Sequence, residues 1–259
     1  MNNHKTVEVS DKILVFSDSD GRVNSVIILG KQGTVVVDTQ VTLEHGRALR
    51  DFAKEMSAGR PLVAVVLTHE HFDHIAGNQF FDCPIISTEP ARKEILEIPP
   101  SHLPEGLTLT PPTLAFTREL SLYLGDMTLK LRHEGGHCPG ECSIFIPETG
   151  TLIAGDSVFN GRTPYVGDAD VPRWVEVLTR LHAMDPEVVI PGHGEPGPKS
   201  ILLRQRDWLE TFLDIAHQSR RAGLSAEAAA DKVIADLRAD PARKQVIIAG
   251  IRNVWSGSQ

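Results

Sequence analysis

Four residues able to bind a metal ion lie within a stretch of six. The loop that follows the apolar run 62–67 contains His69, His71, Asp73 and His74. Imidazole nitrogens and carboxylate oxygens are the usual ligands of zinc and of other borderline metal ions. Because alternate residues of an extended segment project to one side, His69 and His71 can reach one ion. Asp73 and His74 then turn towards a second, so this single loop predicts a site for two metals.

Three later loops each offer one more candidate ligand. They carry, in chain order, His137 within GGHCPG, Asp156 within GDS and His193 within PGHG. Alone, each is typical of a surface turn, but Asp156 and His193 also come shortly after apolar runs, at 152–154 and 188–190. The spacing of the first loop excludes the helical His-Glu-x-x-His protease motif, because the position four residues after His69 is Asp73.

Composition narrows the range of functions. The chain has 259 residues, 41% of them hydrophobic and 23% charged, which is enough for one large globular domain with an appendage. The formal charge of −8 and the absence of a Lys/Arg run disfavour nucleic acid as a partner. The polar residues 1–10 and the lack of a long apolar run predict neither a signal peptide nor a membrane span. Three cysteines, Cys83, Cys138 and Cys142, fit reduced thiols, so we expect a cytoplasmic protein.

The hydrophobic periodicity predicts alternating strands and helices that place these loops. The expected strands are 12–16, 23–29, 34–37, 62–67, 84–87, 119–124, 127–133, 143–146, 151–154 and 188–190. The first three form an antiparallel meander. The expected helices are 43–58, 89–98 and 172–184, and the segment from 199 to about 253 is helical with breaks near Gly223 and Pro241. A Pro-rich surface loop spans 99–112.

The order of the four motifs, His-x-His-x-Asp-His, Gly-x-His, Gly-Asp-Ser and Gly-His-Gly, resembles the metallo-β-lactamase-fold hydrolases, and among them the glyoxalase-II-like branch. The resemblance covers roughly residues 23–193. It implies an α+β fold, a four-layer αββα sandwich, with a catalytic domain at 1–198 and a helical C-terminal extension at 199–259. It also implies a small-molecule substrate and leaves homo-oligomerisation possible.

The same resemblance implies a role for each candidate residue. His69, His71 and His137 would bind a first metal, Asp73, His74 and His193 a second, and Asp156 would bridge the two. Asp38, which ends the strand 34–37, resembles an acidic residue that supports the ligands from behind. Two zinc ions per chain are expected, with iron or manganese possible.

Such a metal pair lowers the pKa of a bridging water towards about 7, which gives a hydroxide nucleophile at neutral pH. Asp73, placed between the two sites, is expected to orient the hydroxide and handle its proton. The predicted reaction is hydrolysis of a small ester, thioester or lactone.

Residues that differ from those typical of particular branches of the family narrow the range of expected substrates. The β-lactamases typically carry Cys or Ser at the position of Asp156, and the acyl-homoserine lactonases a tyrosine at that of Phe159. The segment 159–165 is a candidate substrate wall. Glyoxalase II enzymes have basic glutathione contacts in their C-terminal helices; the arginines here, Arg204, Arg206, Arg220 and Arg221, do not match them individually.

Other members of the fold remain alternatives. A mononuclear iron persulfide dioxygenase would use His71, His137 and Asp156 and leave the other ligands idle. A β-lactamase or an RNA-processing nuclease is less favoured, the nuclease because of the negative charge of the chain.

Overall fold

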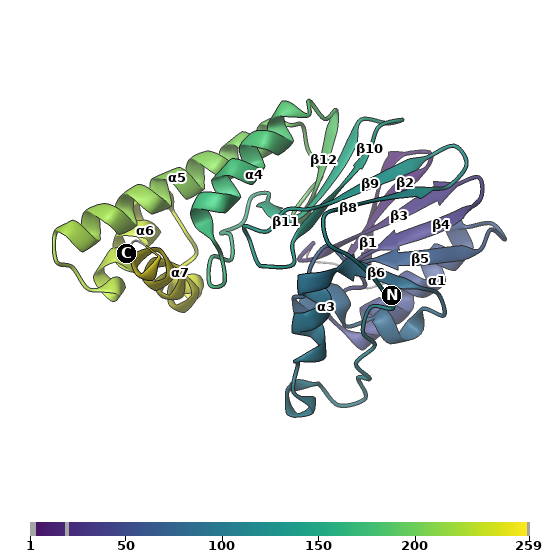
Figure 1. Ribbon diagram of the computed structural model, residues 1–259, viewed down its shortest axis with the longest axis horizontal. Helices are drawn as coiled ribbons and strands as arrows, with labels where there is room; N and C mark the ends of the chain where they lie inside the picture. Colours follow the sequence, from purple (N-terminus) through teal and green to yellow (C-terminus); the bar gives the residue numbers. More distant parts are fainter. Residues whose placement is uncertain (1–3, 19–20, 258–259) are drawn as a thin grey trace.

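The computed structural model describes residues 4–18 and 21–257. Two sheets face each other (Figure 1). The seven-stranded sheet has the order β1-β2-β3-β4-β5-β6-β7, with bounds His4–Ser10, Ile13–Asp18, Asn24–Gly30, Gly33–Val37, Leu62–Val66, Ile85–Thr88 and Leu114–Phe116. The five-stranded sheet has the order β12-β11-β10-β9-β8, with β8 to β12 at Glu119–Tyr123, Thr128–His133, Cys142–Ile146, Thr151–Phe159 and Val188–His193.

Helices cover the outer faces of both sheets. Those against the seven-stranded sheet are α1 (Leu43–Met56), the one-turn α2 (Phe72–Ile75) and α3 (Glu89–Leu96). Those beyond the five-stranded sheet are α4 (Val171–Ala183), α5 (Ser200–Arg221), α6 (Ala226–Leu237) and α7 (Lys244–Ser256). Short 3₁₀ turns occur at Asn78–Phe80, Pro100–His102 and Pro241–Arg243.

The alternating directions of side chains along the strands produce the layers. In β3, Val26 and Ile28 point into the core between the two sheets, whereas Ile27 and Leu29 pack towards α1. Because successive side chains of a strand face opposite ways, one apolar strand contributes to two cores. A third core joins β11 to the helices α4–α7. These cores separate four layers, which confirms the predicted αββα sandwich with C-terminal helices.

The C-terminal helices share their core with the sandwich. Trp174 of α4 and Phe212 of α5 are fully buried in the same cluster as Leu152 and Val158 of β11. The helical segment is thus packed against the rest of the chain, and the domain boundary at 198/199 stays a prediction. Within the described ranges, no helix combines the length and the apolar character needed to cross a bilayer.

Two strands were not predicted. β1 pairs antiparallel with β2 through Val7 opposite Val15, although the N-terminal segment is mostly polar; its residues 1–3 lie outside the described ranges. β7 lies just after the Pro-rich loop and pairs in parallel with β6. Both are edge strands that few apolar residues mark, so their pairing partner, rather than their own pattern, determines them.

Candidate metal centre

The seven predicted ligands lie together at one edge of the sandwich. They come from the segment 69–74 after β5, the loop between β9 and β10, the interior of β11 and the last residue of β12. The seven fall into two groups, in each of which the potential ligand atoms all lie within 4.8 Å of one another, and His137 also forms such a group with Cys138 and Glu141. The two groups of the seven are His69, His71, His137 and Asp156, and Asp73, His74 and His193.

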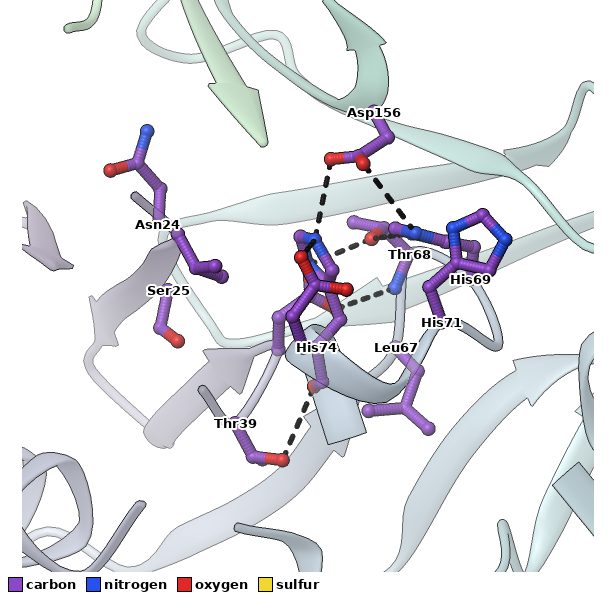
Figure 2. Close-up of polar contacts among 12 residues, drawn as sticks. Asn24, Ser25, Thr39, Leu67, Thr68, His69, His71, His74 and Asp156 are labelled. Atoms are coloured by element: carbon purple, nitrogen blue, oxygen red, sulfur yellow. Dashed lines mark hydrogen bonds and ion pairs between the residues drawn. The ribbon is translucent and has the colours of Figure 1, made fainter. Parts of the chain in front are cut away.

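Asp156 joins the two groups. Its Oδ2 lies 3.6 Å from Nε2 of His137 and 3.8 Å from Nε2 of His69. The same oxygen is 3.0 Å from Nε2 of His193, and Oδ1 is 3.3 Å from Nε2 of His74. Figure 2 shows the carboxylate of Asp156 above His69 and His74, facing both. One buried carboxylate therefore faces imidazoles of both groups.

The other nitrogens of these rings are anchored away from the centre. Nδ1 of His69 lies 2.9 Å from Thr68 Oγ1, and Nδ1 of His74 lies 2.8 Å from Asp38 Oδ2. Nδ1 of His193 contacts the carbonyl oxygen of Arg22. Since these oxygen atoms can accept a hydrogen bond from Nδ1–H, we assign the tautomers with Nε2 unprotonated and directed inward.

Several inward atoms have no hydrogen-bond partner among the described residues. They include Nε2 of His69, Nε2 of His74 and Oδ1 of Asp156, all buried. Buried polar groups are almost always satisfied, so this set calls for a bound species. Imidazole and carboxylate donors converging on one point fit a divalent metal ion.

Asp38 lies directly behind the cluster. Its Oδ1 accepts the backbone N–H of Thr68 at 2.7 Å, and its Oδ2 accepts the Thr68 hydroxyl at 2.7 Å as well as Nδ1 of His74. Asp38 has a φ of 58°, a left-handed conformation that Asp tolerates better than most residues. One carboxylate thus ties the end of β4 to the loop that carries the first four candidate ligands.

Asp73 and His71 form the accessible side of the centre. The Asp73 side chain is 34% exposed, and its Oδ2 is 3.6 Å from Nε2 of His193. His71 is 22% exposed, with Nδ1 3.1 Å from Nε2 of His137. Both line a pocket of about 240 Å³ together with Tyr165. Solvent or substrate therefore reaches the cluster from the side of these two residues.

Burial and neighbouring charges set the protonation of the cluster. Burial lowers the pKa of His69 well below its usual value, and it lowers the pKa of His137 to about 3. Burial opposes ionisation of Asp156, but the facing His193 and His74 outweigh it and hold the Asp156 pKa well below its usual range. Neutral imidazoles and an ionised carboxylate are the forms that bind metals.

The pKa of His74 moves in the opposite direction. Burial disfavours its imidazolium, but the carboxylates of Asp156, Asp73 and Asp38 prevail and raise the pKa well above its usual value. A buried group of carboxylates favours a positive charge among them, either a proton or a metal ion.

Sequence reasoning missed two acidic residues at this site. Asp168 Oδ2 lies 3.3 Å from Nε2 of His71, the ring nitrogen that does not contact His137. Glu141 is fully buried, with Oε2 3.5 Å from Nδ1 of His69, and burial followed by the charge of Asp156 raises its pKa well above the usual value. Neither has a local sequence signal, because each contact joins residues more than 70 positions apart.

Glu70 and Cys138 pack beside the cluster. Glu70 is buried, and its Oε1 accepts the N–H of Gly140 at 3.3 Å. Cys138 is a free, buried thiol whose pKa burial raises well above its usual value, as expected for a reduced packing cysteine.

Comparison with known proteins places this geometry in a family. The family model described as the metallo-beta-lactamase superfamily matches residues 18–193. The probable metallo-hydrolase YqgX of Bacillus subtilis (strain 168) is 26% identical over 176 residues, 63% of this chain and 81% of that protein. The acyl-coenzyme A thioesterase MBLAC2 of Gallus gallus is 29% identical over 210 residues, 69% of this chain and 74% of that protein.

Solved structures support the same fold. A metallo-beta-lactamase from Pontibacter korlensis superposes with a TM-score of 0.70 at 22% sequence identity, over 80% of this chain and 99% of that one. The segment matched by the family model is more than half of the chain and includes all seven clustered residues. The chain therefore belongs to the metallo-beta-lactamase superfamily.

Proposed function

We propose that the chain is a hydrolase that cleaves a small ester, thioester or lactone at a dinuclear zinc centre. The observation that carries the proposal is the position of Asp156, whose carboxylate faces His69 and His137 on one side and His74 and His193 on the other. A carboxylate shared in this way is suited to bridge two cations.

In the proposed centre, His69, His71 and His137 would hold one zinc and Asp73, His74 and His193 the other, and Asp156 would be shared by both. The two groups of converging ligand atoms support this division. Asp38 positions His74 through its bond to Nδ1 and positions the loop through Thr68.

Bound zinc would supply Lewis-acid polarisation of the carbonyl and would lower the pKa of water for attack. The chain itself contributes the rest. Asp73 is the accessible carboxylate beside the cluster, so we assign it the orientation of the attacking water and the transfer of its proton. Phe159 and Tyr165 line the same pocket and exclude water from the bond to be cleaved.

The proposed substrate class rests on both residues and relatives. Asp at position 156 differs from the Cys or Ser typical of β-lactamases, and one relative is named an acyl-coenzyme A thioesterase. These features favour the glyoxalase-II-like branch and acyl substrates. The negative net charge supports a small molecule, rather than nucleic acid, as the partner, and the free cysteines support a cytoplasmic location.

Metal content tests the proposal most directly. Elemental mass spectrometry of protein purified without chelator or added metal should give close to two zinc ions per chain, and a panel of esters, thioesters and lactones should then reveal turnover. About one iron per chain with little zinc would overturn the proposal in favour of a persulfide dioxygenase.

A paired substitution shows whether the metal lies at this site. Asp156→Asn removes the shared negative charge and should lower the zinc content to one ion or fewer. Asp236→Asn, at an exposed position of α6, should retain both ions. Equal zinc content in the two variants would place the metal elsewhere.

A further inference from the structure

A basic cavity of about 550 Å³ lies beside the metal centre. One wall is the segment 159–164, from the last residue of β11 onward, and the other consists of α5, the end of α6 and the turn before α7. Figure 1 shows these helices grouped at one end of the molecule, next to the end of β11. The charged residues that line the cavity are Arg162, Arg204, Arg238, Asp240 and Arg243.

Three arginines of this cavity, Arg204, Arg238 and Arg243, lack an acidic partner among the described residues. Arg204 donates to two neutral acceptors, Ser200 Oγ at 3.2 Å and Asn160 Oδ1 at 3.4 Å. Within residues 4–18 and 21–257, neither Arg204 nor Arg238 nor Arg243 forms an ion pair with a carboxylate. The carboxylate of Asp240 is instead engaged as a cap, since it accepts the N–H of Ala242 at 2.9 Å.

A buried amide adds a second signal. Gln205 is only 5% exposed and lines the cavity. Its Oε1 accepts the N–H of Phe159 at 3.0 Å, but its Nε2 has no partner among the residues that the structure describes. A buried donor without a partner, next to several guanidinium groups, favours a negatively charged ligand with several acceptor oxygens.

The cavity adjoins the pocket of the metal centre. Phe159 and Arg243 line both spaces. Phe159 also stacks on His193, with ring centroids 4.7 Å apart and an interplanar angle of 12°. A molecule seated among the arginines can therefore extend past Phe159 to the cluster.

We propose that the substrate carries a phosphate group that binds in this basic cavity while its scissile carbonyl lies at the metal centre. This inference rests on the proposed function and specifies its substrate class. Arg204, Arg238 and Arg243, with only Asp240 as an acidic lining residue, favour a multiply charged anion over a monocarboxylate. The C-terminal helices thereby form half of the specificity site.

A matched pair of thioesters tests the inference, namely S-acetylpantetheine and S-acetyl-4′-phosphopantetheine, which differ by one phosphate. The zinc-loaded enzyme should hydrolyse the phosphorylated compound with a kcat/KM at least about tenfold higher than that for S-acetylpantetheine. A factor of this size corresponds to the free energy of one charge-assisted hydrogen bond. The double variant Arg204→Gln/Arg238→Gln should lose this preference through a higher KM for the phosphorylated compound. Equal kcat/KM for both compounds in the unmodified enzyme would overturn the inference.

The control variant is Arg221→Gln. Arg221 ends α5 about 25 Å along the helix from Arg204, and it does not line the cavity. This variant should keep the full preference. A preference that persists equally in the double variant would show that the phosphate binds elsewhere.

Binding of inorganic phosphate, followed by calorimetry, separates this inference from the proposed hydrolysis. The affinity should fall about tenfold or more in Arg204→Gln/Arg238→Gln and stay unchanged in Arg221→Gln. Phosphate binding with this dependence but no thioester cleavage would support the cavity and reject thioester hydrolysis. Thioester cleavage without such binding and without a preference would reject the cavity alone.

Discussion

Asp73 is the most exposed of the seven clustered residues, at 34% of its side chain. Because it is also the only accessible carboxylate of the cluster, we expect Asp73→Ala to lower kcat by about 100-fold or more, the usual contribution of a general acid or base. The remaining ligands should keep most of the bound zinc. Steady-state kinetics and elemental analysis of the same preparation measure both effects.

Asp236→Ala on α6 is the control for this substitution, since it removes an exposed carboxylate far from the cluster in sequence. Its kcat should equal that of the unmodified protein. Intact turnover in Asp73→Ala would contradict the assigned role, and equal loss of zinc and activity would make Asp73 a ligand only.

Position 192 requires glycine because it lies close to the carboxylate of Asp156. A Cβ at Gly192 would lie 1.9 Å from Asp156 Oδ1, a distance that no real Cβ contact shows, so Gly192→Ala must displace the shared carboxylate. We expect zinc affinity to fall about 10- to 100-fold, as when the support of a metal ligand is removed. A competition titration with a chromophoric chelator measures this change.

Gly257→Ala provides the comparison. Its added Cβ meets Asn253 O at 3.6 Å, an ordinary contact at the end of α7, and zinc affinity should not change. If Gly192→Ala bound zinc as tightly as Gly257→Ala, the position of Asp156 would not control the centre.

At the scale of elements, Asn24 joins the two sheets at the centre. Its Nδ2, at the start of β3, donates to Pro191 O at 2.8 Å and Gly194 O at 2.7 Å, on either side of His193. Asn24→Ala leaves two carbonyls of the β12 end without this donor. We expect a loss of about 1–3 kcal/mol in the free energy of unfolding and weaker zinc binding, measured by denaturant unfolding and chelator competition.

Gln79→Ala is the matched amide deletion. Gln79 Oε1 accepts the exposed N–H of Thr108 at 2.7 Å, away from the cluster. It should cost less stability and leave zinc affinity unchanged. A loss of zinc affinity in both variants would mean that the effect of Asn24 is not specific to His193.

Patterns local to the chain predicted most elements. The apolar strands from Ile13 to Val66, the helix that begins at Leu43 and the parallel strand before His193 were all confirmed, because burial imposes a regular period on each. β1 and β7 were missed because edge strands receive little of that burial.

The residues of the candidate site also divide into those that local sequence patterns predicted and those that they did not. The seven clustered residues were predictable, since they occur in a recognisable order within or next to apolar runs and Gly-rich segments; β11 extends beyond the predicted strand 151–154, so Asp156 lies inside it. Asp168, Glu141 and the lining of the basic cavity were not. At the cavity, Arg204 contacts Asn160, which follows β11 and lies 44 positions earlier in the chain. Sequence spacing does not indicate a contact over that separation. The arginines of the C-terminal segment looked alike in sequence, and only Arg204 of the four singled out lines the cavity.

At the scale of the whole molecule, the metal centre links the two sheets. His69 and His74 follow a strand of one sheet, whereas Asp156 and His193 belong to the other. Bound metal should therefore stabilise the folded chain by mass action, by about 4 kcal/mol at a thousandfold excess over Kd. We expect chelator dialysis to lower Tm and added zinc to restore it, as followed by calorimetry. Asp156→Asn should show a much smaller shift. An unchanged Tm after verified zinc removal would mean that the sandwich is held without its metals.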